Sequence, residues 1–452
     1  MRDLGISIPG KPQLPALLTH NLAFFNRSHT KHTASRHPRS SSKPRRLAPD
    51  DITKLNMSFS PAQGIQDLRN HKWKPSDLQY AVLAFLTLFS LYITPSAPIL
   101  KTLALCASAL ILLIPATRQF ALPSSPIWVW LLYFFSSRFI DNQYRPHIWV
   151  RVLPALENVL YGANLSNILS AHQHAVLDIL AWLPYGIMHF AAPAVCSAIL
   201  FLYCAPGTVP VFARTFGWMC ILGVTIQLIF PCTPPWYENE RGLVPAAYGM
   251  SGSPAGLARI DKIFGVDLYT TNFSTAPVPF GAFPSLHAGN AVLEALFMSH
   301  AFPKLRTAFI VYAAWVWWAT MYLSHHYAID LVGGGLIAAS FFYTARARWL
   351  PRRQEGKANR WAYDYVEIGE RNTLSDEEYG QYVGLSMMEH RRDSSDAWTL
   401  GGASSSGSSN SSVSGSLSPT VTDVTIPGSS ESEMEARKFW DGPSSPRRAE
   451  IQ

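Results

Sequence analysis

Charged residues are scarce in this 452-residue chain, where they make up 15% of the sequence against 48% for hydrophobic residues. The charges are also unevenly placed, because the chain from about Leu78 to Leu350 is dominated by long apolar runs. A run of about 20 apolar residues is long enough to cross a bilayer as a helix. The scarcity therefore argues against an ordinary water-soluble protein and predicts a polytopic membrane protein with two polar tails.

Several common signatures of nucleotide-binding and metal-dependent sites are also missing. The sequence contains no Walker motif, no glycine-rich dinucleotide fingerprint and no His-Glu-x-x-His. No internal repeat with a period of about 20–50 residues is visible. The five cysteines lack the spacing of a metal site, and most of them lie in or beside apolar runs, so core packing is their expected role.

The two ends of the chain are predicted to be disordered, cytosolic tails. Residues 1–77 are basic, as in SRHPRSSSKPRR, and they lack the apolar core of a cleavable signal. Residues 351–452 include the Ser/Gly-rich stretch from Gly401 to Pro419. The net charge of +7 is concentrated in the tails and short loops. This placement is typical of the cytosolic segments of membrane proteins rather than of nucleic-acid binding.

The predicted fold class is all-α, a transmembrane helix bundle of about six to eight spans. The candidate spans are Leu78–Thr94, Pro98–Ala116, Leu122–Ile140, Leu183–Cys204, Val211–Phe230, Ser285–Phe302, Leu305–Ser324 and His326–Ala345. An even number of spans puts both tails on one side, where the basic loop residues also fall. Residues 78–230 would then hold the N-terminal spans with a luminal segment at 141–182. Residues 231–284 would form a luminal loop, and residues 285–350 a C-terminal core.

The two predicted luminal segments carry further signals. Residues 141–182 are expected to include an amphipathic stretch on the membrane surface, although Pro154 interrupts its apolar pattern. Asn164 and Asn272 each head an Asn-x-Ser sequon. Both are candidate glycosylation sites if these segments face a secretory lumen.

The stretch HHYAID, from His325 to Asp330, places polar side chains between two apolar runs. His326 and Asp330 are four residues apart and would share one face of a helix. Asp330 could then hold one ring nitrogen of His326 and leave the other as a nucleophile or base. The glycines at 333–335 follow closely and would allow another backbone to approach.

The stretch FGAFPSLHAGNA, from Phe280 to Ala291, predicts the start of another helix at Pro284 and Ser285. His287 would lie in the first turn of this helix, beside free backbone N–H groups that attract anions. Between His287 and His326 the chain forms one apolar run, a short KLR turn and a second run. Both histidines should therefore return to the same membrane face, which points to phosphoryl transfer.

Arginines suited to phosphate oxygens occur upstream, in SSRFIDNQYRP. Arg138 and Arg145 should reach the same face, so Arg138, Arg145 and Ser285 are the candidate phosphate-binding residues. Taken singly, each of these features also fits a different role. The arginines could anchor a helix end at lipid phosphates. The His–Asp pair could join two helices or relay protons in a transporter. A His/His/Asp set could bind zinc, although no ligand cluster with the usual spacing supports this.

Together the three elements resemble the type-2 phosphatidic acid phosphatase superfamily. The first reads Arg138 to Arg145-Pro146, with arginine in place of the usual lysine, and the second reads Pro284-Ser285-Leu286-His287. The third ends in His326-x-x-x-Asp330, but the arginine that normally precedes it would fall at Thr320. A phosphate-binding cation is therefore missing or supplied from elsewhere, with Arg259 and Lys262 as candidates.

Longer strings, including PCTPPWYENERG and GAFPSLHAGNAVLEALF, are similar to the fungal inositol phosphorylceramide synthases over most of Leu78–Leu350. The resemblance implies transfer of phosphoinositol from phosphatidylinositol to ceramide in the Golgi membrane, with a luminal site in residues 285–350. It also implies a small regulatory membrane subunit as partner, sensitivity to cyclic peptide inhibitors, and no metal or other cofactor.

The same resemblance assigns His326 as nucleophile, Asp330 as its orienting group and His287 as acid and base. Direct attack by ceramide, with His326 as base, stays open at this point. A lipid phosphate phosphatase with water as acceptor, and a non-enzymatic transporter or scaffold, are the competing functions. Asp141, Glu157 and Glu238 are interpreted as solvated loop residues, with recognition of inositol hydroxyls as the alternative.

Overall fold

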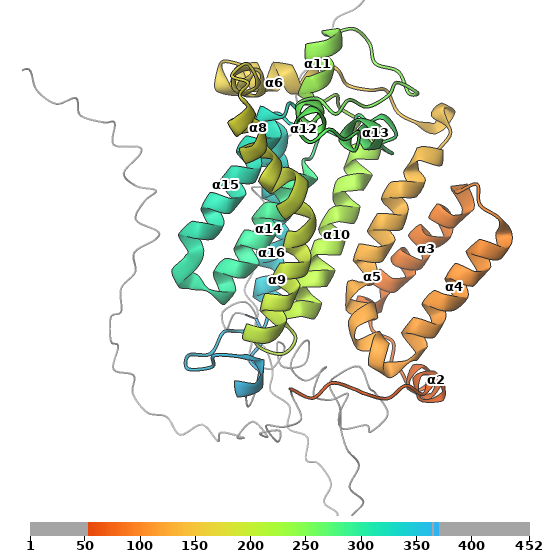
Figure 1. Ribbon diagram of the computed structural model, residues 1–452. Helices are drawn as coiled ribbons and strands as arrows, with labels where there is room; N and C mark the ends of the chain where they lie inside the picture. Colours follow the sequence, from red (N-terminus) through yellow and green to blue (C-terminus); the bar gives the residue numbers. More distant parts are fainter. Residues whose placement is uncertain (1–52, 364–365, 370–452) are drawn as a thin grey trace, which may run out of the picture. The chain divides into compact units, whose positions relative to one another are not determined.

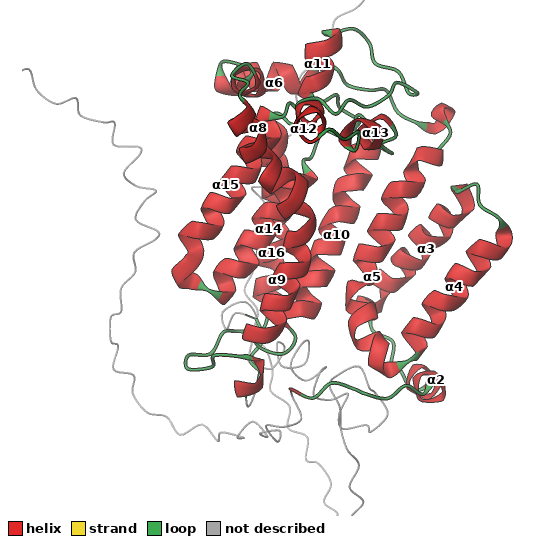
Figure 2. Ribbon diagram, viewed as in Figure 1, coloured by secondary structure: helices red, strands yellow, loops and turns green. Residues whose placement is uncertain are grey.

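The computed structural model describes residues 53–363 and 366–369, all of them within one compact unit. Regular structure in these residues is helical, and only isolated β-bridges occur outside the helices (Figure 2). The predicted all-α fold is therefore confirmed. The disorder predicted for residues 1–52 and 370–452 falls outside the described residues.

Eight long helices make up the bundle within the described part of the chain (Figure 1). They are α3 (Leu78–Ile93), α4 (Pro98–Leu113), α5 (Pro115–Ser136), α9 (His189–Tyr203), α10 (Thr208–Ile229), α14 (Leu286–Ala301), α15 (Arg306–Tyr322) and α16 (Ala328–Arg348). Each of them overlaps a predicted span, although α5 begins at Pro115 rather than at the predicted Leu122. Helix α10 packs against α5, and α14 packs against α9, α15 and α16.

Four helical stretches in the described residues are long and apolar enough to cross a membrane alone: Pro75–Ile93, Ala175–Tyr203, Thr208–Ile229 and Ala328–Arg348. Helices α4 and α5 make a fifth if they form one span, broken by a bend of 114°. Helices α14 and α15 have 16 and 17 residues and are short for a crossing. The chain is thus a membrane protein whose shorter helices lie within the bundle.

Part of the segment predicted to be luminal, residues 141–182, is itself helical. It contains α6 (Val152–Tyr161) and α7 (Leu165–Ser170). Pro154 lies in the first turn of α6, where a missing N–H breaks no intrahelical bond. Pro154 therefore lies inside α6 without breaking it, and the apolar stretch becomes helical only from Val152.

The fourth span begins at Ala175 rather than at the predicted Leu183. Helix α8 (Ala175–Trp182), a π-helical turn η5 (Leu183–Met188) and α9 follow one another without a break. Helix α8 contains a buried charged residue, Asp178. Its carboxylate is paired with Arg259, at 2.7 Å, and accepts a hydrogen bond from the Tyr322 hydroxyl, at 2.9 Å.

Part of each predicted tail is ordered and packed against the bundle. Helix α2 (Pro61–Arg69) lies within residues 1–77, and its Asp67 forms an ion pair with Arg118, which is buried in α5. In residues 351–363, the Arg360 guanidinium lies 4.5 Å from the centre of the Phe201 ring. The prediction of disorder is wrong for these two stretches, because each buries a charged group on the bundle.

Short helices gather at the two ends of the bundle (Figure 1). Helices α6, α11 (Pro235–Arg241), α12 (Leu257–Phe264) and α13 (Tyr269–Ser274) lie at one end, and α2 lies at the other. The remaining turns are η2 (Pro75–Asp77), η3 (Ser137–Phe139), η4 (Asn142–Tyr144), η6 (Pro303–Leu305) and η7 (Arg360–Ala362). The end that carries α11 to α13 is also where α14 and α16 begin.

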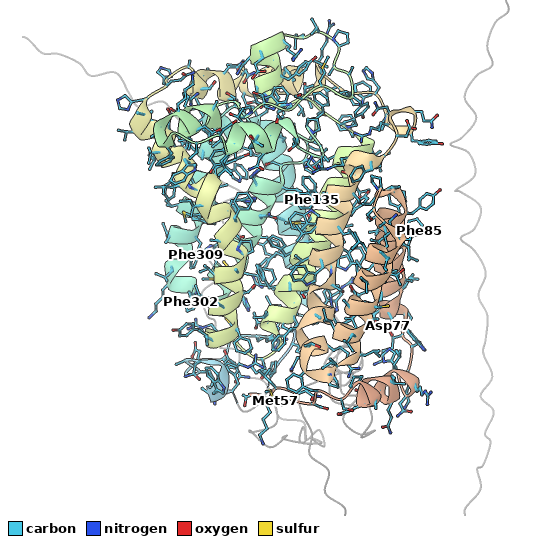
Figure 3. All side chains as sticks on the ribbon, turned by 45° about the vertical axis from the view of Figure 1, so that its right-hand side comes forward. Met57, Asp77, Phe85, Phe135, Phe302 and Phe309 are labelled. Atoms are coloured by element: carbon cyan, nitrogen blue, oxygen red, sulfur yellow. The ribbon has the colours of Figure 1, made fainter. Side chains whose placement is uncertain are left out.

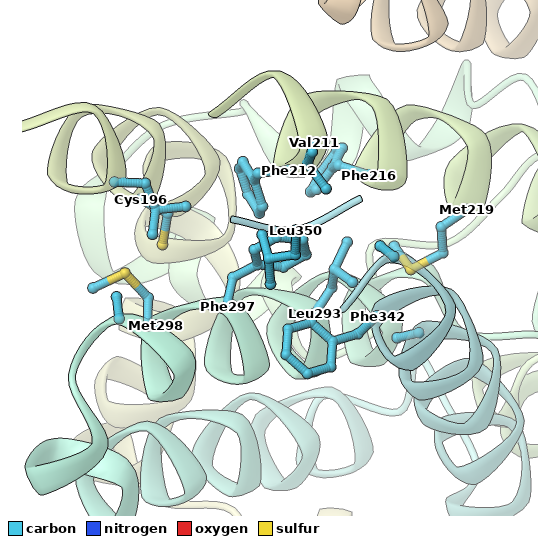
Figure 4. Packing of buried hydrophobic residues seen from close by; sticks show 14 of the residues in the cluster. Cys196, Val211, Phe212, Phe216, Met219, Leu293, Phe297, Met298, Phe342 and Leu350 are labelled. Carbon is cyan, nitrogen blue, oxygen red and sulfur yellow. The ribbon is translucent and has the colours of Figure 1, made fainter. Parts of the chain in front are cut away.

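Apolar side chains fill the space between α9, α10, α14 and α16 (Figure 4). The Phe297 ring meets the rings of Phe212 and Phe342 edge to face, each at 5.1 Å between centroids. Large apolar side chains also cover the outside, as at Phe85 and Phe135 (Figure 3). An apolar exterior around an apolar core is what a lipid environment requires.

Helices α14 and α16 approach each other closely at their N-terminal ends. The Ser285 N–H donates to the Asp330 carbonyl at 3.0 Å. A Cβ atom added to Gly334 would lie 2.1 Å from the Ser285 carbonyl oxygen, which is far inside van der Waals contact. The close backbone approach predicted at the glycine run is confirmed at Gly334.

Replacing Gly334 with alanine is expected to push α14 away from α16, because the new methyl group would overlap backbone rather than a flexible side chain. Overpacking of this kind costs about 1–3 kcal/mol. A thermal unfolding scan of the purified protein in detergent should show a lower midpoint for Gly334→Ala. The control is Leu336→Ala on the same helix, at a side chain that is 64% exposed. Equal midpoints for Gly334→Ala and wild type would show that the close approach is not required.

Candidate active site

The two histidines singled out in the sequence meet at the ends of α14 and α16. Nδ1 of His287 lies 3.1 Å from Nε2 of His326, and the ring centroids are 5.2 Å apart. His287 is in the first turn of α14, and His326 precedes the first turn of α16. The prediction that both side chains return to one end of the bundle is confirmed. Their catalytic role stays a prediction at this point.

Ser285 shapes the start of α14 and so places His287. Its side-chain oxygen accepts a hydrogen bond from the Ala288 N–H at 3.3 Å, which makes Ser285 the N-cap of the helix. Its own N–H is bonded to the Asp330 carbonyl, and the residue is fully buried. These contacts show that Ser285 orients the helix that carries His287. Its predicted role in binding phosphate stays a prediction.

Asp330 lies beside the other ring nitrogen of His326. The distance from Asp330 Oδ1 to His326 Nδ1 is 3.3 Å, within ion-pair range but not aligned as a hydrogen bond. The other carboxylate oxygen, Oδ2, accepts the Tyr327 N–H at 3.1 Å. Asp330 is completely buried and His326 nearly so. The carboxylate is thus held by the backbone on one side and faces the imidazole on the other.

Two aromatic residues that the sequence patterns did not reveal complete the wall around His287. The Tyr185 ring stacks on the His287 ring at 4.6 Å, and the His189 ring lies 4.5 Å from it. Tyr185 belongs to the π-helical turn η5, and His189 follows that turn. π-turns occur often at functional sites. The available signal was the pair Tyr185 and His189, four residues apart beside Pro184 in an otherwise apolar run.

His325 faces a different set of neighbours from His326. Its ring lies between those of Tyr185, at 5.2 Å, and Phe273, at 4.7 Å. Burial lowers the pKa of His325 to about 3, and the nearby His326 contributes to this shift. His325 is therefore neutral and packs between aromatic rings, and it does not belong to the pair formed by His287 and His326.

The acidic loop residues differ in their surroundings. Asp141 is exposed and accepts the Gln143 N–H. Glu238 accepts hydrogen bonds from the Asn164 side chain at 2.9 Å and the Tyr327 hydroxyl at 3.0 Å. Glu157 is fully buried and bonded to backbone N–H groups of α16. The interpretation as solvated loop residues is therefore wrong for Glu157, and it overlooks the hydrogen bonds of Glu238.

Arg145 is occupied by the backbone where α5 ends. Its Nε donates to the Ile140 carbonyl at 2.9 Å, and its Nη2 donates to the carbonyls of Ser137 and Arg138. The guanidinium also lies 4.9 Å from the centre of the Tyr248 ring. Burial lowers the pKa of Arg145 from its ordinary value.

Arg145 lines a cavity of about 420 Å³ whose walls include Tyr133, Gln227 and Tyr248. The residues lining it do not include His287 or His326. Arg138 is exposed. In the described parts of the chain, no hydrogen bond or ion pair joins Arg138 or Arg145 to the histidine pair. Their phosphate-binding role stays a prediction.

The candidate replacements for the missing arginine are placed elsewhere. Arg259 donates twice to Asp178 Oδ1, at 2.9 and 2.7 Å, so its charge is already balanced. Lys262 is exposed on α12. Thr320 is buried under the histidines, and its carbonyl accepts the N–H groups of His325 and His326. Within the described residues, no group of three or more His, Cys, Asp or Glu side chains is arranged to hold a metal ion.

The donors that remain beside the pair are backbone groups. The first N–H groups of a helix have no partner within that helix. For Leu286 and His287, no backbone acceptor outside the helix occurs among the described residues. These two N–H groups lie at the end of α14 where the histidines meet, and they are suited to bind an anion.

Residues 149–344 match the PAP2 superfamily. The chain is 52% identical over 317 residues to the inositol phosphorylceramide synthase catalytic subunit of Schizosaccharomyces pombe, covering 70% of this chain and 75% of that protein. It is 43% identical to the same subunit of Saccharomyces cerevisiae, and the match covers 70% of this chain and 79% of that protein. It is 44% identical to the inositol phosphorylceramide synthase of Candida albicans, and the match covers 70% of this chain and 67% of that protein. No solved structure is significantly similar.

The neutral, buried His325 predicts a pH-dependent stability. In the unfolded chain its imidazole takes a proton near pH 6.5, whereas in the folded chain its pKa is about 3. Acid therefore favours the unfolded state below about pH 6.5, and the cost from His325 reaches about 2 kcal/mol at pH 5. In His325→Phe, the fall in melting temperature from about pH 7 to pH 5 should be smaller.

The matched control for this experiment is His172→Phe, because His172 is exposed. Its substitution should leave the pH dependence of the melting temperature unchanged. An unaltered pH dependence in His325→Phe would contradict the account, since it would mean that His325 gains its proton in the folded protein as easily as in the unfolded one.

Proposed function

Because this chain belongs to the inositol phosphorylceramide synthase family, we propose that it transfers phosphoinositol from phosphatidylinositol to the primary hydroxyl of ceramide and releases diacylglycerol. It would act as a phosphotransferase of sphingolipid synthesis. The observation that carries the residue assignment is the 3.1 Å contact between His287 and His326, with Asp330 behind His326.

In the first half-reaction, His326 is the nucleophile. Asp330 lies beside Nδ1 of His326 and favours the tautomer with the proton on that nitrogen. The lone pair of Nε2, which faces His287 Nδ1 at 3.1 Å, then attacks phosphorus when the lipid phosphate takes the place of that contact. The new P–N bond forms as the P–O bond to diacylglycerol breaks, and His287 gives a proton to the leaving oxygen. The product is a phosphoinositol group on His326.

The second half-reaction reverses these roles. The ceramide hydroxyl gives its proton to His287 and attacks phosphorus, and the P–N bond to His326 breaks. One histidine thus acts as acid and then as base, a contribution typically worth about 10²–10⁴-fold. The 3.1 Å spacing supports this assignment, because a phosphorus centre at His326 would also lie within reach of His287.

The phosphate oxygens would be held mainly by the start of α14. Ser285 caps this helix, which leaves the N–H groups of Leu286 and His287 for the phosphodiester. Arg138 and Arg145 would attract the anionic lipid to this end of the bundle rather than hold it at the histidines, because Arg145 is bonded to carbonyls. A diester carries less charge than a phosphomonoester, and the absence of an arginine at position 320 fits that.

Exclusion of water favours transfer to ceramide over hydrolysis. His326 is nearly buried, and the rings of Tyr185 and His189 pack against the His287 ring. A buried site lowers the supply of water as a competing acceptor. The same histidines in a wetter site would perform lipid phosphate hydrolysis.

The decisive assay uses the purified full chain in mild detergent with phosphatidylinositol, a fluorescent short-chain ceramide and EDTA. Wild type should form a charged inositol phosphorylceramide that depends on phosphatidylinositol and survives EDTA. His326→Ala should lower the rate by about 10³-fold or more, because the nucleophile is lost. His172→Ala, at an exposed histidine, is the control. Phosphate release from phosphatidic acid without transfer would show that water is the acceptor.

For its location, we propose the Golgi membrane, with the active site luminal and both tails cytosolic, and a small regulatory membrane subunit as partner. This orientation is supported by the position of α2 at the end of the bundle opposite to α11, α12 and α13 (Figure 1). The family resemblance supports the compartment and the partner.

The sequons give a direct test of this orientation. Asn272 is exposed, whereas the Asn164 side chain is bonded to Glu238 and Asn167. A glycosidase-sensitive shift on gels is expected to disappear in Asn272→Gln and to remain in Asn164→Gln. Asn26 and Asn410 head sequons in the two tails. A glycan on either of them would contradict the orientation, because it would place that tail in the lumen.

A further inference from the structure

We propose that Glu157 is a positioning residue of the histidine pair, acting through Asp330. The inference rests on the proposed function, since it concerns the same pair. Glu157 lies in α6, far from both histidines in the sequence, and it belongs to none of the three sequence elements that pointed to the site.

The Glu157 carboxylate joins three helices. Its Oε1 accepts the Ala328 N–H at 3.2 Å and the Leu165 N–H at 3.3 Å. Its Oε2 accepts the Ile329 N–H at 3.1 Å. The residue has an exposed fraction of 0%. Helices α6, α7 and α16 therefore meet on one buried anion, and burial of an anion without such partners would be strongly unfavourable.

Two carboxylates accept the free backbone N–H groups at the start of α16. The first N–H groups of a helix need acceptors from outside its own hydrogen-bond ladder. Asp330 Oδ2 takes the Tyr327 N–H, and Glu157 takes the next two, from Ala328 and Ile329. An anion at a helix N-terminus is further favoured by the helix dipole.

This division leaves one oxygen of Asp330 for His326. With Glu157 present, Asp330 Oδ1 makes no backbone hydrogen bond and lies 3.3 Å from His326 Nδ1. Without Glu157, the N–H groups of Ala328 and Ile329 would be buried without partners, and Asp330 would be the nearest carboxylate on the same turn. Competition from these donors would draw Asp330 away from His326 and leave the imidazole without its orienting group.

Two nearby hydrogen bonds hold α7 and α11 at the start of α16. Ser166 of α7 donates to the Met321 carbonyl at 2.8 Å, and the Tyr327 hydroxyl donates to Glu238 of α11. These bonds hold α7 and α11 against the turn between α15 and α16, so the hydrogen-bond partners of Glu157 are held in place. The consequence is that a change at Glu157 should reach the site through the α16 turn, and not through general loosening.

The test compares Glu157→Gln with wild type in the full chain. The glutamine NH₂ group would face the Ile329 N–H, so one backbone donor loses its acceptor. The kcat for transfer should fall by about 10–100-fold, the size expected from a small misplacement of reacting groups. The KM values for both lipids should stay within about two-fold, because no contact to substrate is removed.

The matched control is Asp261→Asn. Asp261 is also buried, and it accepts the N–H groups of Leu268, Tyr269 and Thr270 between α12 and α13. Its loss should lower the melting temperature as Glu157→Gln does, while kcat stays near that of wild type. An equal loss of kcat in both variants would overturn the proposal, because general destabilisation would then explain it.

A double-mutant cycle tests the route through Asp330. In the Asp330→Asn background, Glu157→Gln should cause less than about a three-fold further loss of kcat, because both changes remove the same orienting effect. A loss as large as in wild type would mean that Glu157 acts independently of Asp330 and would overturn the proposal.

Hydrogen exchange supplies a readout that needs no activity. In Glu157→Gln, the amides of residues 328 and 329 should exchange faster, while those of Ala288 and Gly289 in α14 should not change. Unchanged exchange at 328 and 329 would overturn the proposal. If wild type shows no transfer while exchange behaves as stated, the proposed function fails and the role of Glu157 at α16 still holds.

Discussion

The site depends on one close backbone contact, the 3.0 Å hydrogen bond from the Ser285 N–H to the Asp330 carbonyl. It joins the starts of α14 and α16 and is possible because Gly334 has no side chain to strike the Ser285 carbonyl. His287 lies in the first turn of α14 and His326 just before α16, so the contact brings two residues that are 39 positions apart to 3.1 Å. The same contact holds the backbone of Asp330, whose carboxylate faces His326.

The segments between the long helices hold this arrangement in place. Polar groups buried at the end of a membrane bundle must find partners within the protein. Asp178 is paired with Arg259, and Glu157 binds backbone N–H groups of α16. Residues 141–182 and 231–284 therefore act as a structured cover over the histidine pair.

Local patterns in the sequence were enough to predict the pair itself. The spacing of His326 and Asp330, the cap at Ser285 and the following glycines are all short-range features. The remaining parts of the site depend on long-range contacts: Glu157 bonds to a residue 171 positions away, and Arg145 bonds to carbonyls that only a particular turn brings near. Tyr185 and His189 reach His287 through a π-turn, and a periodic pattern does not reveal the extra residue in such a turn. The predicted starts of two helices missed the turns that contain Arg118 and Asp178, and buried ion pairs are what allow these charges within apolar helices.

The covalent role of His326 can be measured directly from the stereochemistry at phosphorus. A phosphatidylinositol analogue with a chiral phosphorothioate group would be converted to the ceramide product, and the configuration of both would be compared. Two successive in-line displacements, first by His326 and then by the ceramide hydroxyl, predict net retention. Net inversion would contradict the account, because it would mean that ceramide attacks the lipid directly and that His326 serves as a base.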